Sequence, residues 1–356
     1  MRRGNKLSSA KIICKLYKLK EIKSLSKVKA KILNRSETEE VILTRKDKKN
    51  GIVLYGDDAK FNYTWDNFSD IETLETTTVI EEDKDQEEKI QFIKATANIE
   101  YSKQKKRDSN GAYLPKQQRT NEVQVDVYFI SIDANIYAVI CSSQLVYVNR
   151  VRKLIGRENF SSSIPEYSFR NDFFNWLFYQ FDESNGALGD QFFLRGIGGF
   201  MGNITDDQNI FKGVSQQTSE LIITKAFISN GETLKNITAR VKKDNEIDIV
   251  FGIDDKCNTV IYVNQSRKLL ILDSVETSSF LLVYLYGCLI PKLRKLYVSE
   301  EESFANEDKG NFSKKIGLQV IQSIINNNNI DLGEIKEFYE LEKGLEKDTE
   351  KEKQIQ

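Results

Sequence analysis

Apolar and polar residues alternate along much of the first two thirds of the chain, the pattern of half-buried strands. In 123–132, Val123, Val125, Val127 and Phe129 fall on one face, Asp133-Ala134-Asn135 supplies a turn, and 136–141 returns. This spacing predicts an antiparallel hairpin. A second hairpin is expected between 247–251 and 259–263.

Shorter apolar runs predict further strands. We expect strands at 11–19, 41–43, 52–55, 90–101, 220–227 and 233–241. The 41–43 and 52–55 runs flank a turn predicted at Lys49-Asn50-Gly51. The acidic 81–88 stretch predicts a solvated loop or linker.

Helical spacing becomes more frequent toward the carboxyl terminus. After Pro165, aromatic residues from Phe169 to Phe181 recur at helical intervals and are expected in the core. A short helix is expected in the basic 149–157 run, ended by Gly156. Helices are also expected over 280–290, which Pro291 would end or kink, and from Ser313 to the Asn326 to Asn329 run. We therefore predict an α+β fold with antiparallel hairpins and sheets, helices packed on one side, and more helix toward the carboxyl terminus.

The patterns divide the chain into four expected parts. Residues 1–75 read as a basic, β-rich module, and 76–120 as an acidic linker, a strand and a basic loop. Residues 121–330 would form the main α+β domain, followed by a charged tail over 331–356. The longest apolar run is far shorter than the roughly 20 residues of a membrane-spanning helix, so no membrane association is expected.

Composition narrows the possible chemistry. None of the 356 residues is histidine, which excludes Ser-His-Asp and Cys-His catalysis and histidine-ligated zinc. The four cysteines are far apart, with no C-x-x-C pair, and are expected to be buried free thiols in a reducing compartment. No apolar signal segment follows the amino terminus. We expect a cytoplasmic protein without a cofactor or bound metal, and catalytic activity is not favoured.

Charge is balanced overall but unevenly distributed. There are 52 basic and 53 acidic residues, yet 1–35 holds 12 cations and one acid, and two further basic clusters lie at 103–119 and 150–157. Such clusters beside tyrosines are typical of proteins that hold nucleic-acid phosphates without reading sequence. The residues expected to contact phosphates are Lys103, Lys105, Lys106, Arg107, Arg150, Arg152, Lys153 and Arg157.

This pattern supports a leading hypothesis of nucleic-acid binding, with DNA and RNA both open. A role in bacterial antiviral defence or mobile-element biology is suggested only by the excess of Lys, Ile and Asn, which is typical of proteins encoded by AT-rich genomes. The competing explanation is that lysines on a lysine-rich chain cover ordinary solvated faces. A second hypothesis is a protein-interaction or self-assembling accessory subunit, which would bind a protein partner or form a homo-oligomer.

A third hypothesis is a carboxylate-bound metal nuclease. Asp248, Asp254, Asp255 and Lys256 resemble metal-binding carboxylates near a lysine, although hairpin turns also favour aspartate. The glycine-rich run 195–202 could cradle a phosphate, but its spacing fits neither G-x-G-x-x-G nor the Walker A pattern. A flexible loop is the expected structure of that run.

Overall fold

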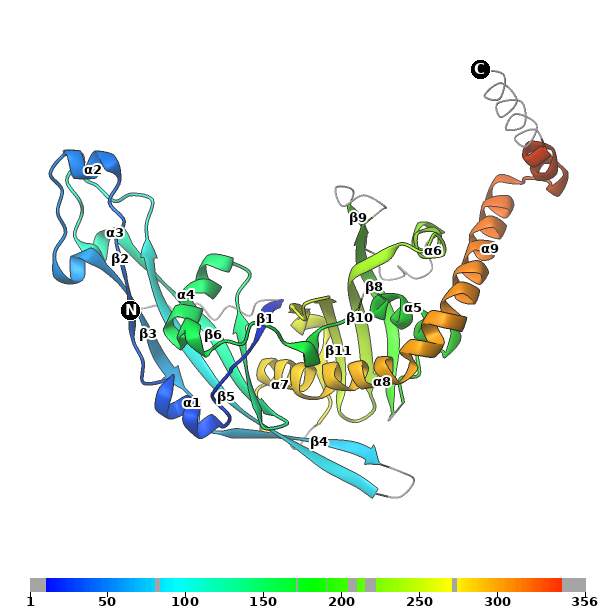
Figure 1. Ribbon diagram of the computed structural model, residues 1–356, viewed down its shortest axis with the longest axis horizontal. Helices are drawn as coiled ribbons and strands as arrows, with labels where there is room; N and C mark the ends of the chain where they lie inside the picture. Colours follow the sequence, from blue (N-terminus) through cyan, green and yellow to red (C-terminus); the bar gives the residue numbers. More distant parts are fainter. Residues whose placement is uncertain are drawn as a thin grey trace, which may run out of the picture.

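A single antiparallel sheet runs through the whole molecule (Figure 1). The computed structural model describes residues 11–80, 84–170, 172–189, 191–203, 210–214, 222–270 and 274–340. Within them, 13 strands form one sheet. Its order is β2 (Glu37–Glu40), β3 (Lys60–Phe68), β5 (Lys84–Ser102), β6 (Thr120–Ile132), β7 (Asn135–Cys141), β1 (Ile12–Lys18), β12 (Thr259–Ile261), β11 (Ile247–Asp254), β10 (Thr233–Lys243), β8 (Phe192–Asn203) and β9 (Ile210–Val214). Two more strands join this path, with β4 (Glu72–Ile80) beside β5 and β13 (Arg267–Lys268) beside β11.

Strand β1 joins the two halves of the sheet. Cys14 lies opposite Cys141 of β7 on one side and opposite Thr259 of β12 on the other. The predicted hairpin of β6 and β7 is confirmed, and Asp133 and Ala134 in its turn both adopt the left-handed conformation, with φ of 47° and 57°. The hairpin of β11 and β12 is confirmed as well.

The sheet has two cores, one on each face. In β5, Phe92 and Ile93 are both fully buried but belong to different cores, because successive side chains on a strand point to opposite faces. Helices α1 (Leu25–Lys31) and α4 (Leu145–Ile155) cover one face of the amino-terminal half. Helices α5 (Phe173–Glu183), α7 (Thr277–Tyr284) and α8 (Ile290–Ser303) contribute to the core on the other face. The α+β class is confirmed, but the helices cover both faces. Helix α7 also contacts β4 and β5, so the second core extends into the amino-terminal half of the sheet.

The carboxyl-terminal helices run on from one another. Five-residue π-helical turns, Leu285–Leu289 and Phe304–Asp308, connect α7 to α8 and α8 to α9 (Lys309–Asn328), which leads away from the sheet (Figure 1). Gly287 allows the first turn to approach β5, because a Cβ there would lie 2.8 Å from the Cδ1 atom of Ile90. Phe173, Trp176 and Leu177 of α5 are buried, as predicted. No helix in the described parts of the chain is both long and apolar enough to cross a membrane.

Three local predictions were wrong. The 41–55 segment holds α2 (Arg45–Lys49) in place of a strand pair, because Thr44 and Asp47 form a capping box that starts a helix. Residues 222–229 form α6 (Ile222–Ser229) in place of a strand, a helix that packs on α9. A short apolar run is compatible with a helix or a strand, and its packing in the folded protein determines which one forms.

The glycine-rich run is the third case. It lies within strand β8, hydrogen-bonded between β9 and β10, and so is part of the sheet and not a loop. The acidic stretch also extends into a strand, since β5 begins at Lys84, while 81–83 lie outside the described residues. Two expected domain boundaries, after residues 75 and 120, fall within β4 and β6, and the sheet continues across both.

Candidate nucleic-acid interface

The amino-terminal half has one end that lies away from β1. At this end, α2 and the 103–115 loop lie side by side (Figure 1). Asp47 in α2 is fully buried and holds them together. Its carboxylate accepts hydrogen bonds from the Thr44 amide at 2.8 Å and the Tyr113 hydroxyl at 3.1 Å, and it forms an ion pair with Arg107. The Arg107 guanidinium also lies 5.1 Å from the centre of the Tyr113 ring.

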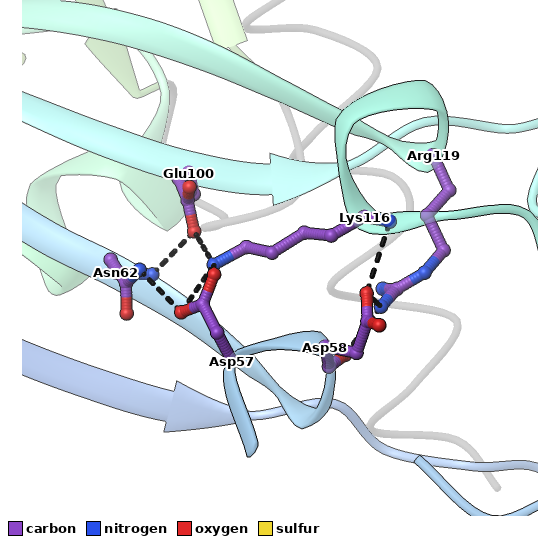
Figure 2. Close-up of polar contacts among 6 residues, drawn as sticks. All are labelled: Asp57, Asp58, Asn62, Glu100, Lys116 and Arg119. Carbon is purple, nitrogen blue, oxygen red and sulfur yellow. Dashed lines mark hydrogen bonds and ion pairs between the residues drawn. The ribbon is translucent and has the colours of Figure 1, made fainter. Parts of the chain in front are cut away.

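A network of polar groups, half-buried at Lys116 and Asn62 and exposed at Asp57, supports this end (Figure 2). The Lys116 amine, at the start of α3 (Lys116–Arg119), lies 3.0 Å from Asp57 in η1 (Gly56–Ala59) and 2.8 Å from Glu100 in β5. Asn62 of β3 donates from its backbone amide to Glu100 at 2.6 Å and from its side-chain amide to Asp57 at 2.9 Å. Hydrogen bonds from Asn62 and Lys116 stabilise the ionised form of Asp57 and lower its pKa.

A second ion pair lies beside the first. The buried Arg119 guanidinium is 3.2 Å from Asp58 and also donates to the Asp58 carbonyl and, at 2.9 Å, to the Leu114 carbonyl (Figure 2). The strands and loops that meet here are thereby fixed relative to one another.

Charge at this end is strongly unbalanced once these contacts are counted. Residues 44–59 and 103–119 contain ten cations and four acids. Three acids form ion pairs with Arg107, Lys116 and Arg119, and Asp108 accepts from the amides of Asn110 and Ala112, each at 2.9 Å. Six exposed cations have no ion-pair partner among the described residues, and we call them the basic tip: Arg45, Lys46, Lys48, Lys49, Lys105 and Lys106.

An aromatic side chain lies close to the basic tip in the sequence. Tyr55, between α2 and η1, is 77% exposed, and Val53 is 57% exposed. An exposed ring this close in the sequence to unpaired cations is suited to stacking on a base whose phosphates those cations neutralise.

The structure divides the predicted residues of the 103–119 cluster. Lys105 and Lys106 are exposed and belong to the basic tip. Arg107 instead pairs with Asp47, and the Lys103 amine donates to the Gln118 carbonyl at 3.1 Å.

Most predicted residues of α4 have partners within the chain. Lys153 pairs with Glu39, and the Arg150 guanidinium lies 6.0 Å from the centre of the Tyr63 ring, whose hydroxyl donates to Glu39 at 2.8 Å. Partial burial of Glu39 would raise its pKa, but hydrogen bonds from Lys153 and Tyr63 outweigh this and lower it.

Arg152 and Arg157 of the same cluster differ in their environment, because Arg152 packs against aromatic rings and Arg157 is exposed. The Arg152 guanidinium lies 4.7 Å from the Tyr17 ring centre and 5.0 Å from that of Phe160, which makes it part of the packing between α4 and β1. Arg157 is exposed just after Gly156, which has φ of 99° and ends α4 as predicted.

The amino-terminal cations are also partly engaged. Lys18 pairs with Glu166, Lys29 lies 2.7 Å from Asp70, and the Lys11 amine is 4.9 Å from the Tyr262 ring centre. Arg2, Arg3 and Lys6 lie outside the described residues.

The candidate metal-binding carboxylates are not brought together. Asp248 and Asp254 are at opposite ends of β11, roughly 20 Å apart at the usual rise per strand residue. Asp248 is held by Arg240 at 2.6 Å, and Asp254 accepts from the amides of Lys256 and Asn258 in the turn. Asp255 follows Asp254 in that turn. In the described ranges, no group of three or more Asp, Glu, Cys or His side chains could hold a metal ion.

Sequence reasoning missed the α2 cations and Tyr55. The signal was present as Thr44-Arg45-Lys46-Asp47, a helix start followed by two more lysines. It was obscured because the flanking apolar residues resemble strands.

No family model matches this sequence, and no curated protein sequence is significantly similar to it.

Proposed function

We propose that this protein binds nucleic acid through the basic tip, by phosphate contacts with limited base selectivity. The observation that carries this proposal is the pairing of charges. Every acid in the 44–59 and 103–119 segments is engaged, whereas the six cations of the tip are exposed and without ion-pair partners among the described residues.

The rigidity of the support adds to the proposal. The buried Asp47 and the Lys116 network hold the backbone beneath the tip, so the flexible lysine side chains project from a fixed base. Fixed backbones with mobile cationic ends suit a polyanion whose phosphates are spaced regularly and whose bases vary. A role in defence or mobile-element biology stays a prediction.

The test is binding to labelled single- and double-stranded DNA and RNA over a salt series, by fluorescence anisotropy. We expect affinity to fall steeply with salt. The variant K48A/K49A/K105A/K106A should reduce the slope of log affinity against log salt for single strands by about 0.7 for each phosphate that it no longer neutralises. At 0.1 M salt, this corresponds to an affinity about fivefold weaker for each such phosphate.

A charge-matched control makes this test specific. The variant K20A/K27A/K256A/K295A removes four exposed lysines away from the tip and should leave affinity within about twofold of wild type. Equal losses of affinity in both variants would show that binding depends only on net charge. An absence of binding by the wild type at low salt would refute the proposal.

A second candidate function is self-association through the projecting α9. Leu318 and Ile321 on this helix are 58% and 51% exposed, and Leu332 and Phe338 beyond it are 73% and 65% exposed. A second copy, packed antiparallel, would cover these side chains symmetrically and bring Lys314 near the acidic 334–340 end of its partner.

Sedimentation analysis over a concentration series tests this candidate. The mass should rise from 41.0 kDa toward twice that value for wild type. L318D/I321D should remain at the monomer mass. A wild-type mass that stays at the monomer value at high concentration would remove this candidate.

A further inference from the structure

A second cationic surface lies in the carboxyl-terminal half of the sheet, on the face opposite the core of α5, α7 and α8. It contains a pocket of about 500 Å³. Its lining comprises four cationic side chains, one carboxylate and one apolar residue: Arg195, Arg240, Lys242, Arg267, Asp248 and Leu269.

Strand register explains why these side chains converge. Asp248 of β11 lies opposite Lys242 of β10 on one side and opposite Arg267 of β13 on the other. Arg240 is two residues from Lys242 on β10, so both side chains point to the same face.

A β-bulge brings in the fourth cation. Arg240 pairs with Gly196 of β8, but the next residue of β10, Val241, pairs with Leu194, which leaves Arg195 as the extra residue. Leu194 and Ile197 are buried while Arg195 is exposed, so the bulge turns Arg195 away from the core. Its guanidinium lies 4.8 Å from the centre of the Phe193 ring.

The charges in the pocket are only partly neutralised. Arg240 holds Asp248 with two parallel hydrogen bonds, of 2.8 and 2.6 Å, and Lys242 lies 2.6 Å from Asp244. Arg195 and Arg267 have no ion-pair partner in the part of the chain that the structure describes. Like charges gathered in one concavity raise the local concentration of an anion.

We infer that this pocket binds a phosphate group, with Arg195 and Arg267 as its direct ligands and Arg240 held in place by Asp248. Planar guanidinium groups match two oxygens of a phosphate at once. The volume exceeds that of a phosphate alone and falls within the range of small-molecule sites. The phosphate therefore belongs either to a small molecule of nucleotide size or to a nucleic-acid strand.

Two probes distinguish these sources. ATP, titrated calorimetrically with chelator present, represents the small molecule, and a labelled oligo-dT of about 20 nucleotides, long enough to span one single-strand site, represents the strand. We expect R195A/R267A to weaken binding of at least one probe about tenfold or more, with R195K/R267K intermediate because lysine keeps the charge but loses the planar fork.

The controls separate this site from the basic tip. K20A/K256A removes the same charge elsewhere and should change neither affinity more than about twofold. The tip variant K48A/K49A/K105A/K106A should leave ATP binding unchanged. The inference about the pocket is therefore tested separately from the proposal about the basic tip. Both guanidiniums are exposed, and thermal melting checks that each variant folds.

Each result decides the inference. ATP binding that weakens in R195A/R267A assigns the pocket to a small molecule. A loss confined to oligo-dT assigns it to a strand. If R195A/R267A binds both probes as wild type does, or if neither probe binds wild type, the inference is overturned.

Discussion

The basic tip and the α4 cluster are similar in sequence and opposite in environment. Both draw on short basic runs near tyrosines, at 103–107 and 150–157, although the tip takes only Lys105 and Lys106 from the first run and its other cations from α2. In α4, Arg152 packs against Tyr17 and Phe160, and Lys153 pairs with Glu39. At the tip, the acids are used by other cations and six cations remain exposed. Cation density in a sequence therefore indicates an interface only after the partners within the fold are known.

The sharpest test of the comparison is Arg107, which lies in the tip segment but has the environment of a structural cation. Arg107→Ala leaves the fully buried Asp47 without its counter-charge, so we expect a loss of about 3 kcal/mol in the free energy of unfolding, measured with urea. The exposed neighbour provides the control, since Lys106→Ala should change stability by less than about 0.5 kcal/mol. If the two variants are equally stable, Arg107 is not the structural cation described here.

Arg152 tests the α4 side of the comparison with a smaller effect. Arg152→Ala removes contacts with two rings and should cost about 1 to 2 kcal/mol in the free energy of unfolding. Nucleic-acid affinity should stay within about twofold of wild type. Arg157→Ala, at an exposed position of the same cluster, is the stability control. A large loss of nucleic-acid affinity in Arg152→Ala with an unchanged free energy of unfolding would show that α4 contacts nucleic acid.

The smallest expected effect concerns pH and the Lys153–Glu39 pair. Because the pKa of Glu39 is lower in the folded protein, its ionised form stabilises the fold above its unfolded pKa, and this contribution is lost as pH falls through the folded value. Wild type should exceed Glu39→Gln in stability by less than about 1 kcal/mol at pH 7.

Denaturation at several pH values measures this difference. The advantage of wild type over Glu39→Gln should shrink below about pH 4.5, the ordinary value for glutamate. A difference that is constant from pH 7 to pH 3 would show that the charge of Glu39 is not what stabilises this contact.

Local patterns predicted the fold well where one strand or helix carried enough signal. The hairpin of β6 and β7 was predicted because its alternation is long and an Asp-Ala-Asn turn separates the two strands. The α4 helix was predicted from its glycine stop. Predictions failed at 41–55 and 220–227, where apolar runs of three or four residues fit a helix or a strand. The contacts of Asp47 and of α6 in the folded protein determine which one forms.

The candidate sites were less predictable than the fold. Lys105 and Lys106 were predicted from sequence to contact phosphates, but α2 joins them through the contacts of Asp47 with Arg107, 60 residues later, and with Tyr113. The pocket was signalled only in part: the glycine-rich run considered as a phosphate cradle begins at Arg195, but Arg240 and Arg267 join it from β10 and β13 through strand register.

The amino-acid sequence by itself determined the absence of histidine chemistry, the α+β class and the main hairpins, since these depend on composition and on neighbours within one strand or helix. Only the tertiary structure decided which cations are neutralised and which stay exposed. It also placed β1 between the two halves of the sheet, where it pairs with β7 and β12. Ion pairing and strand register act through space between residues far apart in the chain, so no local pattern encodes them.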